Sequence, residues 1–165
     1  MNQQPAVNVF QNFAVEKPSQ FDVDKLANKF RYKNTGWSIP EAYLCLLFSA
    51  AMADGSFDGS EGEVIKQAVS RSRAMTSLSP PDLANANNSV NQRLQQNPNA
   101  LDEACQTLPA EMCLPVFAHC VEIILSDGQL LKSEADFLQS LTTKLDIEPD
   151  NARRVMEVLL MKAQY

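Results

Sequence analysis

The 165-residue sequence has few of the residues that carry catalytic and nucleic-acid-binding chemistry. It holds one histidine, and none of its four cysteines forms a Cys-x-x-Cys pair, which argues against a zinc knuckle or a dithiol redox motif. Basic residues are scarce, with 14 Lys and Arg against 20 Asp and Glu, so the net charge of −6 does not favour a nucleic-acid partner. No Gly-rich phosphate loop, metalloprotease motif or nucleophile elbow occurs. These absences favour a protein that is not an enzyme.

Long apolar runs are also missing. The longest uncharged apolar stretch, residues 42–53, is shorter than the roughly 20 residues that span a bilayer, so no transmembrane segment is expected. No Lys or Arg precedes Lys17 and no apolar core follows the start, which predicts no secretory signal and a cytoplasmic protein. In that compartment the cysteines are expected to be reduced and to act as small buried hydrophobes. They are Cys45, Cys105, Cys113 and Cys120.

Helical periodicity is the main pattern that is present. Residues 1–20 are polar, contain Pro5 and Pro18, and are predicted to form an irregular N-terminal arm. From Phe21 onward apolar residues recur at helical spacing, and no alternating strand pattern appears. The length suits one domain. We therefore predict a single all-α domain, a helical bundle, over residues 21–165.

Capping residues mark several helix starts. Ser38 stands three residues before Glu41 with a proline between them, which predicts a helix over about 40–53. Ser60 and Ser79 begin similar signals, because each precedes an acidic residue at the same spacing. Two further helices are predicted from the prolines at 109 and 149. The stretch 83–94 is thinly apolar and rich in Asn and Gln, which suits either a peripheral helix or a frayed connector.

The chain aligns with itself at a shift of 73 residues. Asp54-Gly55 falls on Asp127-Gly128, and Ser60-Glu61 falls on Ser133-Glu134. Each copy is an apolar helix, the sequence Asp-Gly-x5-Glu and an amphipathic helix, so two related helical hairpins are predicted over about 39–73 and 112–146. The glycines suit the left-handed conformation that ends a helix, and the serines suit the cap of the next one.

The repeated motif resembles the TerB family, which comprises the tellurite-resistance TerB proteins and relatives such as the N-terminal domain of a membrane-linked DnaJ-type co-chaperone. The resemblance covers about residues 38–163, and Ser126 stands where the usual motif has alanine. It implies an all-helical fold of about seven helices with internal pseudo-twofold symmetry. It also implies an acidic face that is a candidate site for a divalent cation, and a role in bacterial stress and tellurite resistance.

The candidate metal ligands are Asp54, Glu61, Asp127 and Glu134. If the two loops lie together, their carboxylates can face one ion, and calcium, which takes 6–8 oxygen ligands, would be completed by backbone carbonyls and water. Magnesium and zinc are further candidates. The spacing is not that of an EF-hand. The alternative is that these residues only cap and charge helix ends in exposed loops.

Two polar residues lie in the apolar stretch that includes residues 116–125. His119 has no nucleophile and orienting acid nearby in the sequence, so a structural role is expected. Glu122 would be costly to bury unpaired, so it either faces solvent or points toward the acidic loops.

These observations predict a non-enzymatic TerB-like protein that binds a divalent metal. It would act as a scaffold or adaptor, with an unidentified protein partner, in a bacterial stress or tellurite-resistance response. The alternative is a metal-independent protein-interaction module, as the co-chaperone relative suggests.

Overall fold

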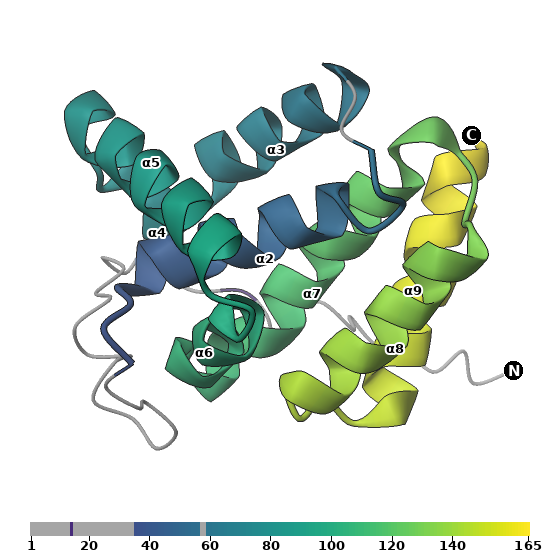
Figure 1. Ribbon diagram of the computed structural model, residues 1–165. Helices are drawn as coiled ribbons and strands as arrows, with labels where there is room; N and C mark the ends of the chain where they lie inside the picture. Colours follow the sequence, from purple (N-terminus) through teal and green to yellow (C-terminus); the bar gives the residue numbers. More distant parts are fainter. Residues whose placement is uncertain (1–13, 15–34, 57–58) are drawn as a thin grey trace, which may run out of the picture.

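The computed structural model describes residue 14 and residues 35–56 and 59–165, and the regular structure within these residues is all helical. The predicted arm over residues 1–20 lies outside the described residues apart from Ala14, as do residues 21–34 of the predicted domain. Figure 1 shows the helices gathered into a single body. In order they are α2 (Ile39–Ala51), α3 (Gly59–Arg71), α4 (Arg73–Thr76), α5 (Pro80–Gln96), α6 (Ala100–Thr107), α7 (Ala110–Ile124), the 3-10 helix η2 (Leu125–Asp127), α8 (Lys132–Lys144) and α9 (Pro149–Gln164).

The all-α prediction is confirmed, although the helix count differs slightly. The described residues form eight α-helices where about seven were expected, and the shortest of them, α4, has four residues. The helix predicted over 40–53 ends two residues earlier, at Ala51. The helix predicted from the proline at 109 is α7, and the 3-10 turn of η2 follows it directly. None of the described helices combines the length and the apolar character that crossing a membrane requires.

Helix α2 lies at the centre of the fold. It packs against α5, α6 and α7, and it also contacts α3, which lies above it in Figure 1. Nine of its 13 residues are buried, as expected for a helix that is apolar on every side. The predicted capping box begins it: the Glu41 amide donates to Ser38 Oγ (3.3 Å), and the Ser38 amide donates to Glu41 Oε2 (2.9 Å).

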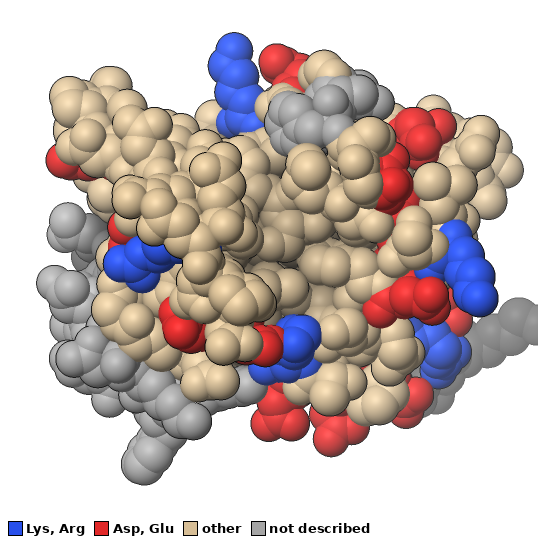
Figure 2. All heavy atoms as spheres, in the orientation of Figure 1, with Lys and Arg blue, Asp and Glu red and all other residues tan. Residues whose placement is uncertain are grey.

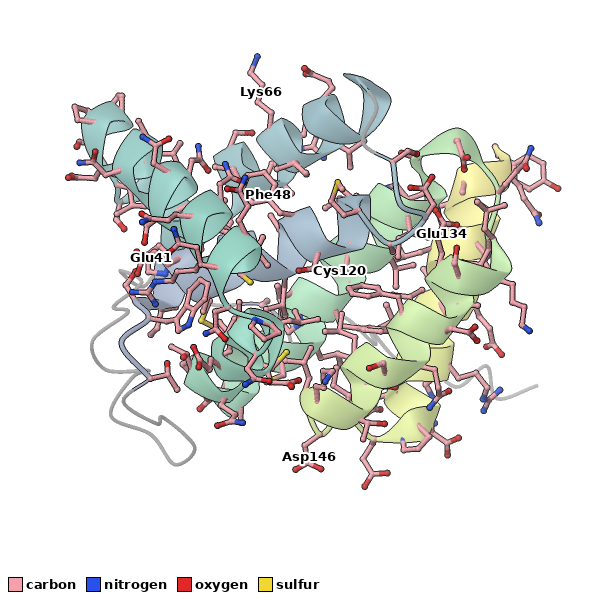
Figure 3. All side chains as sticks on the ribbon, in the orientation of Figure 1. Glu41, Phe48, Lys66, Cys120, Glu134 and Asp146 are labelled. Atoms are coloured by element: carbon pink, nitrogen blue, oxygen red, sulfur yellow. The ribbon has the colours of Figure 1, made fainter. Side chains whose placement is uncertain are left out.

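Helix α7 runs beside α2 and contributes the second half of the core. The Cys120 thiol, at the contact between the two helices, donates to the Leu46 carbonyl oxygen at 3.6 Å (Figure 3). All four cysteines are buried free thiols, as predicted. Burial raises the pKa of Cys45 and of Cys105 to about 12, so these thiols stay protonated and unreactive at neutral pH.

Helix α5 is peripheral, which decides between the two alternatives for residues 83–94. It runs from Pro80 to Gln96, and only Ala86 and Val90 are buried. The predicted cap is confirmed, since Ser79 Oγ accepts from the Asp82 amide at 3.3 Å. Near its other end the Arg93 guanidinium lies 4.5 Å from the ring centre of the buried Trp37.

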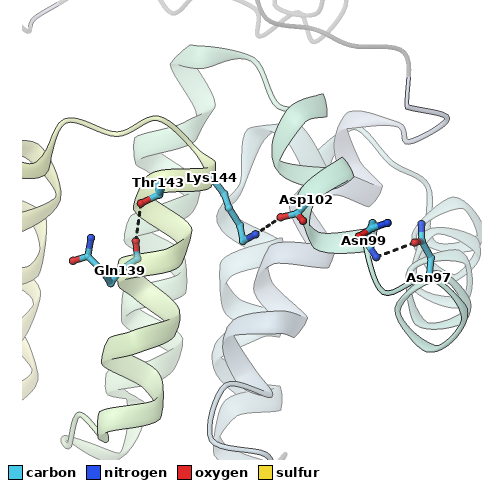
Figure 4. Close-up of polar contacts among 6 residues, drawn as sticks. All are labelled: Asn97, Asn99, Asp102, Gln139, Thr143 and Lys144. Atoms are coloured by element: carbon cyan, nitrogen blue, oxygen red, sulfur yellow. Dashed lines mark hydrogen bonds and ion pairs between the residues drawn. The ribbon is translucent and has the colours of Figure 1, made fainter.

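Helices α8 and α9 complete the fold on the other side of α7. An ion pair between Lys144 and Asp102 ties α8 to α6 (Figure 4). Close to it, the Thr143 hydroxyl donates to the Gln139 carbonyl oxygen within α8, at 3.4 Å. Helix α9 packs mainly on α7 and η2, and Ala152 is its one buried residue.

Candidate functional site

The loops after α2 and after η2 have the same local backbone geometry. Gly55 and Gly128 both take the left-handed conformation, with φ of 86° and 80°. In each loop the glycine amide donates to the carbonyl oxygen three residues earlier, at 2.9 Å. The predicted left-handed glycines are therefore confirmed. That the hairpins over 39–73 and 112–146 are related as whole units stays a prediction.

The aspartates of the two loops are engaged in their own turns. Asp54 Oδ1 accepts from the Ser56 amide at 2.8 Å, and Asp127 Oδ1 accepts from the Gln129 amide at 2.9 Å. The Ser56 hydroxyl also lies 3.0 Å from both oxygens of Asp54. Both aspartates are exposed, so their carboxylates are held by short local hydrogen bonds in contact with water.

The predicted serine caps of the next helices are wrong. Helix α8 begins at Lys132, so Ser133 lies inside it, and the Leu131 amide is bound instead by Glu134 Oε2 at 2.7 Å. The glutamate thus supplies one half of a capping box, the bond to the amide of the residue before the helix, although no serine stands at that position. Helix α3 likewise begins at Gly59, so Ser60 is not its cap. Glu61 occupies the third position of α3, as Glu134 does in α8, but its side chain lies outside the described part.

Glu134 connects the two acidic loops. Its side chain is 5% exposed and lies beside the loop that follows α2 (Figure 3). Burial raises the pKa of Glu134, and the charges of Asp127 and Asp54 raise it further, against the opposing hydrogen bond from Leu131. Figure 2 shows acidic side chains gathered over this end of the molecule. Three of the four predicted ligands therefore share one electrostatic environment, although 73 residues separate the two aspartates.

The donor set suits a hard cation, but it is not a preassembled site. Its ligands are carboxylate oxygens, which calcium and magnesium prefer, whereas zinc favours nitrogen and sulfur. Among the described side chains, which do not include Glu61, no three His, Cys, Asp or Glu groups are placed to hold one ion. Asp54 and Asp127 would have to leave their turn hydrogen bonds to ligate an ion together with Glu134.

Glu122 and His119 of α7 have partners that no sequence pattern indicated. Glu122 is half-buried and pairs with Lys162 of α9, with 2.6 Å between Oε1 and Nζ, so it lies at the surface in an ion pair. His119 Nδ1 is hydrogen-bonded to the Tyr43 hydroxyl of α2. Tyr43 and His119 are 76 residues apart in the chain, and only the packing of α2 on α7 brings them together.

Comparison with models of protein families, with curated proteins and with solved structures gives no match for the chain. The resemblance to the TerB family thus stays a prediction that rests on the paired Asp-Gly-x5-Glu motif.

Proposed function

We propose that the protein is a cytoplasmic, non-enzymatic TerB-like scaffold or adaptor whose paired acidic loops bind a divalent cation, in a bacterial stress response of the tellurite-resistance type. The observation that carries the proposal is Glu134, a carboxylate whose pKa is raised first by its burial and then by the charges of Asp127 from one loop and Asp54 from the other. A carboxylate in this position is unfavourable by itself, and a divalent cation between the loops would relieve the repulsion.

Calcium is the cation that the donor set favours. Its flexible coordination tolerates carboxylates from two loops, whereas magnesium requires near-octahedral geometry. Ligation costs the turn hydrogen bonds of Asp54 and Asp127, each worth about 0.5–1.5 kcal/mol net. We therefore expect a dissociation constant on the order of 10⁻⁴ to 10⁻³ M, as in weak calcium modules. Glu61, at the third position of α3, is the proposed fourth ligand.

Calorimetric titration of chelator-treated protein with calcium, magnesium, manganese and zinc tests this proposal. We expect saturable calcium binding that becomes at least tenfold weaker in Glu134→Gln and in the double variant Asp54→Asn, Asp127→Asn. Glu148→Gln is the matched control, because this exposed glutamate precedes α9 and lies outside the proposed ligand set. Failure of all four cations to bind folded protein, or equal affinity in Glu134→Gln and Glu148→Gln, would refute the metal site.

A metal-independent interaction module is the second candidate, and the surface of α9 favours it. Val158 and Met161 are each 58% exposed and lie on one face of the helix, with Tyr165 following at helical spacing. On this alternative, Met161→Glu abolishes capture of a protein partner in the presence of chelator, and Glu134→Gln leaves capture unchanged. Capture that is lost in Glu134→Gln or on addition of chelator, and kept in Met161→Glu, would support the cation-dependent adaptor.

A further inference from the structure

Helices α3, α7 and α9 enclose a half-open pocket of about 220 Å³, here called the His119 pocket. Its polar lining includes Arg71, His119, Glu122 and Lys162. None of the three described carboxylates of the acidic loops lines it, so it is not part of the proposed cation site. The remaining wall is largely aliphatic.

The hydrogen bond to Tyr43 determines which atom His119 presents to this pocket. Tyr43 is buried, and burial raises its pKa, so the phenol keeps its proton. A hydrogen bond from the Ser72 side chain lowers that pKa, so Ser72 donates to the phenol oxygen, and we assign the phenol proton to the bond with Nδ1. Burial lowers the pKa of His119, which keeps the ring neutral at pH 7. Because Nδ1 accepts, the ring proton sits on Nε2. Nε2 has no hydrogen-bond partner among the described residues, and His119 lines the pocket, so its Nε2–H is the donor that the ring offers to a ligand there.

The charges around the pocket leave one positive charge in excess. Lys162 is paired with Glu122 at 2.6 Å, and Arg71 forms no ion pair with a described residue. The neutral His119 adds a donor without adding charge. In a protein of net charge −6, the pocket is therefore locally cationic, and Glu122 disfavours a second negative charge on a ligand.

We propose that the His119 pocket binds a small aliphatic monocarboxylate, whose carboxylate accepts from His119 Nε2–H and from the Arg71 guanidinium. The hydrocarbon chain lies on the aliphatic wall formed by Val64, Ala68 and Leu159. The size of the pocket, below the 300–1,000 Å³ that is typical for drug-sized ligands, selects a short chain. A metal ion is disfavoured at this ring, because Nε2 carries a proton where a ligand atom needs a lone pair.

Because His119 is the single histidine of the chain, histidine-selective ¹⁵N NMR reads this pocket through one ring. Pentanoate is titrated into the full chain at pH 7.5, with 1-pentanol as the uncharged analogue and inorganic phosphate as the polyvalent anion. We expect a saturable shift of the Nε2 resonance with pentanoate, at least tenfold tighter than with either comparator, while Nδ1 stays bound to Tyr43. An Nε2 resonance that does not move below about 10 mM pentanoate, or that responds equally to pentanol, overturns the proposal.

Arg71→Gln and Lys66→Gln form a matched pair for the charge requirement. Both residues are exposed on α3 and both substitutions remove one positive charge, but Lys66 does not line the pocket and points away from the body (Figure 3). We expect pentanoate affinity to fall about tenfold in Arg71→Gln, the effect of losing one charged hydrogen bond, and to stay within about twofold in Lys66→Gln. Equal affinity in the two variants, with circular dichroism showing both folded, overturns the role of Arg71 and with it the carboxylate assignment.

Discussion

Ionised Glu134 is expected to destabilise the folded protein, and a pair of substitutions separates its charge from its hydrogen bond. Glu134→Gln keeps an oxygen that can accept from the Leu131 amide, but removes the charge that lies near Asp127 and Asp54. Glu134→Ala removes both. Without divalent cations at pH 7.5, we therefore expect Glu134→Gln to be more stable than the wild type and Glu134→Ala to be less stable than Glu134→Gln.

The size of the second difference follows from the helix cap. Losing the acceptor for Leu131 leaves an orphan amide at the start of α8, which costs about 0.5–2 kcal/mol. In a chain of this length, 1 kcal/mol corresponds to a shift of roughly 2–4 °C in the midpoint of thermal unfolding. The two variants should thus be distinguishable by either heat or urea.

The pH dependence gives the sign of the charge effect. The pKa of Glu134 is raised in the folded state, so folding is favoured while the group is protonated. The stabilisation that comes from protonating Glu134 is fully present below the ordinary glutamate pKa of about 4.3. It is lost as the pH rises through the raised pKa of the folded state. The stability gap between Glu134→Gln and the wild type should therefore widen from pH 4.5 to pH 7.5.

Urea unfolding of the three proteins with chelator, at both pH values, measures these differences. The reasoning about the cap is refuted if Glu134→Gln unfolds at as low a urea concentration as Glu134→Ala at pH 7.5, since the hydrogen bond to Leu131 would then contribute nothing. The reasoning about the charge is refuted if Glu134→Gln is no more stable than the wild type at that pH. A gap between Glu134→Gln and the wild type that does not change with pH would also contradict it.

Three further substitutions test the fold. Gly128→Ala places a Cβ at φ 80° and should cost about 1–2 kcal/mol, whereas Gly59→Ala, with an open site and no positive φ, should be neutral or stabilising in the same thermal melts. An equal change in stability at Gly128 and Gly59 would contradict the left-handed conformation of Gly128. Leu47→Ala leaves a cavity at a fully buried site and should lower the free energy of unfolding, measured in urea, by about 2–5 kcal/mol. A fall of less than about 1 kcal/mol would show that neighbouring side chains move in to fill the cavity. Asp102→Asn breaks the ion pair with Lys144, in which the aspartate side chain is 45% exposed and the lysine side chain 32% exposed. The free energy of unfolding should therefore fall by less than about 1 kcal/mol, and by less still in 1 M NaCl. A fall of more than about 2 kcal/mol would show that the pair is shielded from water.

Helices with strong local signals were predictable from the sequence. The capping box at Ser38 and the apolar stretch after it predict α2 because both act within a few residues. Helix α6 was not predicted, since it has eight residues and its Asn99 start has no side-chain cap. The capping roles of Ser60 and Ser133 failed, because α3 begins at Gly59 and α8 at Lys132, one residue before each serine, and residue spacing does not fix a helix boundary that closely.

The candidate site was only partly predictable. The 73-residue shift identified Asp54, Asp127 and Glu134, but not that the aspartates are exposed while the glutamate is buried. That difference depends on how the two loops pack, which no local pattern encodes. The His119 pocket left no sequence signal at all, because its walls come from three helices and its key hydrogen bond joins Tyr43 to His119 across 76 residues.

The central position of α2 has a consequence for synthesis of the chain. Its main partners follow it in the sequence, and 73 residues separate the end of α2 at Ala51 from the end of α7 at Ile124. At roughly 5–20 residues per second, translation leaves α2 without α7, the last of its main partners, for about 4–15 s. During that time α2, which is apolar on every side, lacks the helix that completes its core. Folding of the first half on the ribosome must therefore wait for the second, and the nascent chain exposes a surface suited to a general chaperone.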